Sequence, residues 1–91
     1  MPFGVEWAPR GEDDYHRLPE LLASRLLDQI ERLAQDPVRL STPPRRSGEV
    51  YQRYAYEDVT DDGNDVRVEI LFQYTQDEMS IEILGVGLRE L

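Results

Sequence analysis

Three arginines stand on or beside the β-type runs that end the sequence. Arg53 falls in the first run, Arg67 in the second and Arg89 just after the third. Arginines that converge on one face of neighbouring strands bind a phosphate and stabilise negative charge that develops on it. The alternative is that each arginine pairs with one of the nineteen acidic residues at the surface. The sequence therefore predicts a phosphate-binding site and leaves surface ion pairs open.

Four tyrosines accompany these arginines on the same runs. Phenol rings stack on nucleic acid bases, but they also pack against a half-buried sheet, which is the favoured interpretation. A phenol is protonated near neutral pH unless a neighbouring arginine lowers its pKa, so it accepts a proton only in such a setting. Tyr74 is our candidate for this catalytic role. The four residues are Tyr51, Tyr54, Tyr56 and Tyr74.

The remaining polar residues give weaker signals. Four aspartates crowd one turn and could hold a hard cation, but the spacing D-x-x-D-D-x-x-D differs from an EF-hand loop. A solvated hairpin tip is favoured, so we predict no metal and no cofactor. His16 is the only histidine, and its charged neighbours indicate an exposed helix residue. The absence of cysteine excludes thiolate chemistry. The aspartates are Asp58, Asp61, Asp62 and Asp65.

Charge is unevenly distributed along the chain. All ten basic residues are arginines, and nineteen acidic residues bring the net charge to −9. Residues 37–53 hold four arginines against Glu49 alone, and Arg45 and Arg46 in this patch are our candidates for nucleic acid contacts. Residues 54–91 hold ten acidic residues against two arginines, which opposes docking on RNA and favours a basic partner. A solvated acidic surface is the simpler alternative.

The elements that position these residues are organised around one helix, predicted over residues 18–37. Pro19 suits a first helical position, and Pro37 disfavours helical geometry at Asp36, so the helix is expected to end near Gln35. Its apolar residues recur at helical spacing and form a broad face that must be covered. The face comprises Leu22, Leu26, Ile30 and Leu33, widened by Ala23, Leu27 and Ala34.

Four further runs predict strands, and the third of them alternates cleanly. Val66, Val68, Ile70, Phe72 and Tyr74 fall on the side that we expect to meet the helix. The residues between and after the strands predict a short first helix, an extended loop and a tail past the last strand. The strands are predicted at residues 3–7, 50–56, 66–74 and 80–86, the short helix at 11–17 and the loop at 38–49.

Together these elements predict an α+β fold of order β-α-α-β-β-β. A helical hairpin packs on one face of a mainly antiparallel sheet, and Trp7 is expected to join the core. Ninety-one residues suit one domain, 1–91. No run is long enough to span a membrane and no signal peptide pattern opens the chain, so a cytoplasmic location is expected.

The order of these motifs resembles the RelE/ParE-type toxins of bacterial toxin–antitoxin systems. VEWAP is similar to the opening strand of that family, and DDYHRLPELLASRLLDQIERLAQDP is similar to its helical hairpin with a Leu-Pro corner. VRVEILFQYTQDEMSIEILGVGLRE resembles its last hairpin. The resemblance implies a RelE-like fold. One branch of the family cleaves messenger RNA in the ribosome, and another inhibits DNA gyrase.

The resemblance also implies roles for particular residues. Arg67 matches the arginine at the start of the penultimate strand and Arg89 the arginine after the last strand, both in phosphate contact in the ribonuclease branch, while Arg53 matches more loosely. The sequence ends at Leu91, where family ribonucleases usually continue to a tyrosine or histidine, and it has no lysine as a substitute. We therefore expect an endoribonuclease without an evident general base.

The implied function is the toxin of a toxin–antitoxin system, or a toxin-like protein with weak or lost mRNA cleavage. A cognate antitoxin is the expected partner, with the ribosome and its message as targets, and a homodimer is compatible with the pattern. The alternatives are a non-catalytic protein-interaction module that keeps the fold, and a ParE-like inhibitor of DNA gyrase.

Overall fold

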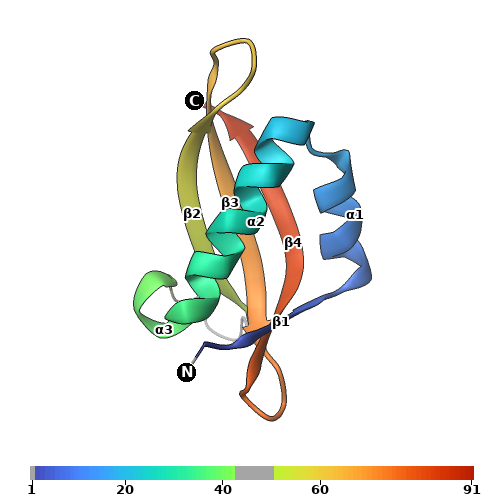
Figure 1. The fold of residues 1–91 in the computed structure, drawn as a ribbon, viewed down its shortest axis with the longest axis vertical. Coiled ribbons are helices and arrows are strands. Elements are labelled where there is room, and N and C mark those ends of the chain that lie inside the picture. Colours follow the sequence, from blue (N-terminus) through green and yellow to red (C-terminus); the bar gives the residue numbers. More distant parts are fainter. Residues whose placement is uncertain (1, 43–50) are drawn as a thin grey trace.

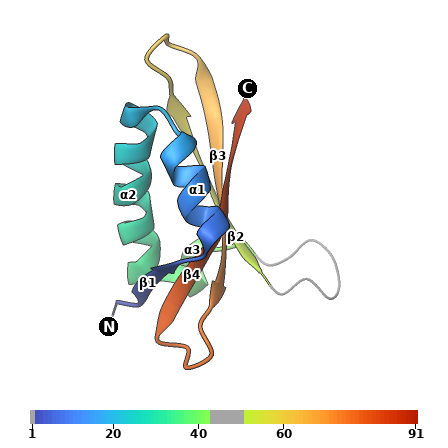
Figure 2. The ribbon, with the colours of Figure 1, turned by 90° about the vertical axis from the view of Figure 1, so that its right-hand side faces the viewer.

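The computed structural model describes residues 2–42 and 51–91. Helices α1 and α2 lie on one side of a sheet (Figure 1, Figure 2). The predicted order of a strand, two helices and three strands is confirmed, with one short helix, α3, added. The elements are β1 (Gly4–Trp7), α1 (Pro9–Arg17), α2 (Glu20–Gln35), α3 (Pro37–Leu40), β2 (Gln52–Val59), β3 (Asp65–Tyr74) and β4 (Ser80–Glu90).

The sheet has the strand order β1-β4-β3-β2. Strands β2, β3 and β4 are antiparallel neighbours, whereas β1 joins β4 in parallel. The sheet is therefore mainly antiparallel, as predicted. The register between β3 and β4 shifts beside Leu71 and Phe72, which leaves Leu84 of β4 without a partner in β3. Such a bulge bends the strand locally and increases its twist.

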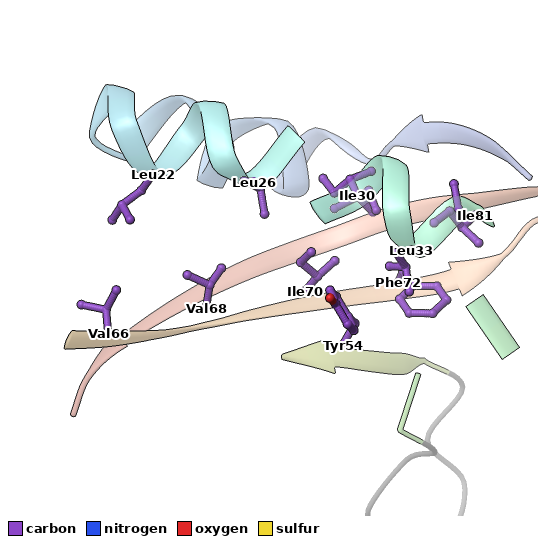
Figure 3. Packing of buried hydrophobic residues seen from close by; sticks show 12 residues of the cluster. Leu22, Leu26, Ile30, Leu33, Tyr54, Val66, Val68, Ile70, Phe72 and Ile81 are labelled. Carbon is purple, nitrogen blue, oxygen red and sulfur yellow. The ribbon is translucent and has the colours of Figure 1, made fainter. Parts of the chain in front are cut away.

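The core fills the space between α2 and the sheet (Figure 3). Leu22, Leu26, Ile30 and Leu33 of α2 are all buried, as predicted. Leu27, which was expected to widen this face, is 44% exposed. Trp7 is partly buried against the core. The sheet contributes Tyr54, Val66, Val68, Ile70, Phe72, Ile81 and Ile83 to the buried cluster.

The ends of the first two helices differ slightly from the prediction. Helix α1 begins at Pro9 rather than at Gly11, because proline lacks the N–H that a first helical position leaves unpaired. Gly11 is buried where α1 meets β4, and a Cβ at this position would collide with the carbonyl oxygen of Ile83. Helix α2 begins at Glu20, with Pro19 as its cap, and ends at Gln35.

Two predictions for the later segments are wrong. The start of the predicted loop, residues 38–40, belongs to α3. The Asp36 carboxylate caps this helix by accepting hydrogen bonds from the Arg39 backbone N–H at 3.4 Å and from Arg39 Nε at 3.0 Å. Strand β4 continues to Glu90 instead of ending near Val86, so the predicted tail is part of the sheet. Glycine is disfavoured in strands, but Gly85 and Gly87 remain in β4 because both pair with residues of β3.

Strand β2 also lies later than predicted, at Gln52–Val59 instead of residues 50–56.

No helix in the described part of the chain is long and apolar enough to cross a membrane.

Candidate functional site

The site is built on the face of the sheet that points away from the helices, which we call the outer face. Val66, Val68 and Ile70 of β3 are buried beneath α2, so the alternation of the strand turns Arg67 and Glu69 outward. Arg67 pairs with Arg89 of β4 in the ladder register. Directly opposed residues place their side chains on the same face, with Cβ atoms roughly 5 Å apart. The two predicted phosphate-binding arginines are therefore brought together.

These two arginines share one cavity of about 350 Å³, which we call the arginine cavity. Like charges directly opposed across a ladder are destabilising, so the arrangement is unfavourable for the fold alone. Among the described residues, no carboxylate forms an ion pair with either guanidinium. The pair is thus available to an anion from outside. The cavity is lined by Arg67, Glu69, Gly87, Leu88 and Arg89.

Glu69 and Gly87 complete this cavity, and sequence reasoning missed both. They are partners in the β3–β4 ladder, two residues along each strand from the arginine pair. A Cβ built on Gly87 meets nothing within 4 Å, so the missing side chain leaves open space beside Glu69. The alternation of β3 was the available signal for Glu69, because it places this residue on the same face as Arg67.

A second cavity, of about 300 Å³, continues along β4 and shares Gly87 with the first. Asp14 of α1 lies at its wall, where Oδ2 accepts a hydrogen bond from the backbone N–H of Val86 at 2.9 Å. This contact ties α1 to the strand next to the bulge. The other residues at this cavity are Arg10, Tyr51, Leu71, Leu84 and Gly85.

Arg53, the third arginine of the predicted phosphate site, stands apart from the pair. Arg53 lies on the outer face opposite Leu71, and it is 8% exposed. The β2 residue opposite Arg67 is Glu57, so Arg53 sits further along the strand from the arginine cavity. Arg45 and Arg46, the predicted nucleic acid contacts, lie outside the described residues.

Tyr74, the predicted proton acceptor, is on the helix-facing side of the sheet and not in the arginine cavity. Its ring centroid lies 5.7 Å from that of Phe3 and 6.0 Å from that of Phe72. Burial raises its pKa, an effect that a hydrogen bond with Ser41 opposes and the charge of Asp36 reinforces. The phenol therefore stays protonated and remote from both arginines.

Tyr54 and Tyr56 also face the helices. The Tyr54 hydroxyl donates a hydrogen bond to Gln29 Oε1 at 2.6 Å. The buried Tyr56 hydroxyl has no hydrogen-bond partner among the described residues. Its burial raises the pKa of Tyr56, with smaller contributions from Asp58 and Tyr54. The favoured interpretation of these tyrosines as packing residues agrees with this placement.

The other candidate groups are also placed outside the arginine cavity. Asp58 forms an ion pair with Arg25 of α2 at 2.6 Å, while Asp61 and Asp62 are exposed at the turn. Across the described ranges, no group of three acidic or histidine side chains is arranged to hold a metal ion. His16 is exposed on α1, as predicted, with Nε2 3.6 Å from Glu12 Oε1.

No protein-family model matches the chain, and no curated protein matches its sequence. Solved structures do match. A chain of the RelBE2 toxin–antitoxin complex from Mycobacterium tuberculosis aligns with a TM-score of 0.78 and 20% identity, over 98% of this chain and 100% of that one. This chain has the fold of the RelE toxins. The RelE-like fold implied by the sequence motifs is thereby confirmed.

Two Escherichia coli structures with the RelE fold agree. A RelE mutant in the free state, with two arginines replaced by alanine, aligns with a TM-score of 0.67 and 11% identity over 96% of this chain and 83% of that one. The intact RelBE toxin–antitoxin complex aligns with a TM-score of 0.61 and 11% identity over 93% and 94% of the two chains. At such identities the likeness establishes the fold.

Proposed function

We propose that this chain is the toxin of a toxin–antitoxin system and that it cleaves messenger RNA on the ribosome. The observation that supports this most strongly is the pairing of Arg67 with Arg89 across the ladder, on an open face and without a described carboxylate partner. Two adjacent guanidinium groups bind a phosphodiester and stabilise the charge that develops on its oxygens. RNA supplies its own nucleophile, the 2′-hydroxyl, next to that phosphate.

An antitoxin is the proposed partner. Two of the three structures reported above are complexes of a toxin with its antitoxin. On the helix side of this chain, two cavities of about 310 and 370 Å³ share Trp7 and Leu27, and we call them the helix-side surface. Glu12 and Glu31 stand at their walls, and no arginine is among the described residues that line them. An apolar and basic antitoxin segment is complementary to this surface.

The helix-side surface also favours a second candidate, a non-catalytic interaction module. Leu27 and Val5 are 44% and 37% exposed and line the same cavity of this surface, and contiguous exposed apolar patches mark sites of protein–protein contact. In that case binding to a partner would be the whole function, and the arginine pair would be dispensable.

Expression of the chain in bacteria distinguishes the candidates. We expect growth arrest that Arg67→Ala and Arg89→Ala relieve, while Arg32→Ala, an exposed arginine of α2, leaves arrest intact. Growth arrest that extra DNA gyrase relieves, without RNA cleavage, would favour gyrase inhibition. The interaction module would be favoured by normal growth together with intact message.

A further inference from the structure

We infer that Glu69 is the general base of the RNA cleavage proposed above, an inference that rests on that proposed function. The described residues that line the arginine cavity include one side chain able to accept a proton, and it is Glu69. Guanidinium groups are effectively always protonated, so Arg67 and Arg89 supply charge and hydrogen bonds but no base. The Glu69 carboxylate is thus the general base that was not evident from the sequence alone.

Glu57 lies opposite Arg67 but does not line the cavity, and the described tyrosines and the histidine are placed elsewhere. Tyr54, Tyr56 and Tyr74 face the helices, across the sheet from the arginine pair. His16 is exposed on α1 and lines a cavity with Trp7 and Leu27 on the helix side. Tyr51 lies at the second cavity, which meets the arginine cavity at Gly87.

The spacing along β3 suits a base beside a bound phosphate. Glu69 follows Arg67 on the same face, so their Cα atoms are separated by about 7 Å along the strand. An attacking oxygen lies about 3–3.5 Å from phosphorus, and its base accepts the proton over a further ~3 Å, which places the carboxylate about 6 Å from the phosphate. Gly87 lies opposite Glu69 and has no side chain, so the space beside Glu69 is open and can take a ribose.

The step balances without a cofactor. Glu69 takes the proton of the 2′-hydroxyl while O2′ forms a bond to phosphorus and the bond from phosphorus to O5′ breaks. Arg67 and Arg89 hold the non-bridging oxygens through this step. The departing O5′ takes a proton from water, and Glu69 returns its proton to solvent. The products are a 2′,3′-cyclic phosphate end and a 5′-hydroxyl end.

Single-turnover cleavage of message in pre-assembled ribosome complexes tests this assignment between pH 6 and 8.5. We expect Glu69→Gln to lower the rate constant by about 10²-fold or more, the usual contribution of a general base, without weakening binding of the complexes. Glu57→Gln is the matched control, because Glu57 is the β2 neighbour of Arg67 but does not line the cavity. Its rate is expected to stay within about twofold of wild type.

The pH profile separates a base from a merely structural carboxylate. We expect the wild-type rate to stay flat across this range, because neither a phenol nor an imidazole takes part in the step. We expect Glu69→His to recover part of the activity that Glu69→Gln loses. Its rate should rise through pH ~6.5 as the imidazole loses its proton. Thermal melting of each variant, matched to wild type, confirms that the fold is intact.

Three results would overturn the inference, and they are distinguishable. Cleavage that requires Arg67 and Arg89 but survives Glu69→Gln, or a wild-type rate that climbs about tenfold per pH unit as for a phenol base, would remove Glu69 and leave the proposed function standing. A wild-type chain that binds the complexes but cuts nothing would remove both.

Discussion

Arg67 of β3 lies directly opposite Arg89 of β4, and the described structure offers neither guanidinium a carboxylate within ion-pair distance. Repulsion across the ladder costs folding stability, so the pair makes sense as a site that is completed by an anion. The RelE fold holds both residues on strands, which fixes the spacing of their charges better than loops would.

Reversing one charge of this pair separates stability from activity. Arg89→Glu places a carboxylate opposite Arg67, and we expect the free energy of unfolding to rise by about 0.2–1 kcal/mol. Cleavage of message is expected to be lost. Urea titration measures the first effect, with Arg89→Gln as the control that removes repulsion without creating a pair. A lower stability for Arg89→Glu than for Arg89→Gln would contradict the assigned register.

Filling the arginine cavity tests its role by another route. A Cβ on Gly87 meets no atom within 4 Å, so Gly87→Leu is expected to leave the melting temperature within a few degrees of wild type. The new side chain fills the open space beside Glu69, and cleavage is expected to fall by more than tenfold. Gly87→Ala, which intrudes less, is the graded control. Full activity of the leucine variant would place the reaction elsewhere.

Two neighbouring leucines of α2 test the core. Leu26 is 0% exposed and Leu27 is 44% exposed. We expect Leu26→Ala to lower the free energy of unfolding by about 2–5 kcal/mol, and Leu27→Ala by roughly 0.5 kcal/mol. Denaturant titration compares the two. Equal losses would show that the helix has been rotated about its axis.

The Tyr56 hydroxyl has no partner in the described part of the chain, which predicts an unusual response to mutation. Because a buried polar group without a hydrogen bond costs about 1–3 kcal/mol, Tyr56→Phe is expected to keep or raise stability. Tyr54→Phe loses the bond to Gln29 and is expected to cost about 1 kcal/mol. Chemical denaturation near neutral pH measures both, and a clear loss in Tyr56→Phe would reveal a partner for that hydroxyl.

Tyr56 also predicts that the folded protein loses stability at alkaline pH. Burial raises the pKa of Tyr56 above the ordinary value of 10.0, so above pH 10 the unfolded chain releases this proton while the folded chain retains it. Unfolding therefore becomes more favourable as pH rises past 10. Melting temperatures between pH 8 and 11 are expected to fall more steeply for wild type than for Tyr56→Phe. Parallel curves would show that Tyr56 is not the group responsible.

The local features of this fold could be predicted from the sequence. Helical spacing identified Leu22, Leu26, Ile30 and Leu33, and period-two alternation oriented β3, because both patterns are written within single elements. Proline and the turn residues also located most boundaries.

The site could be predicted only in part, because it depends on pairing between distant segments. The glycines of β4 made residues 87–90 resemble a tail, so Arg89 was expected beyond the strand. The bulge beside Leu71 then sets which residues face one another, and no local pattern reports it. The alternation of β3 places Glu69 on the face of Arg67, but only the pairing with Gly87 shows that a cavity opens beside it.

Cleavage of ribosome-bound message in a purified translation system tests the central claim most directly. The wild-type chain is expected to cut, and Arg67→Ala and Arg89→Ala are each expected to lose at least about 10² in rate, as for removal of one charge-stabilising group, with melting temperatures nearly unchanged. Arg32→Ala, distant on α2, should cut as wild type does. Equal cutting by all four proteins, or none by the folded wild type, would contradict an RNA phosphate site at the arginine pair.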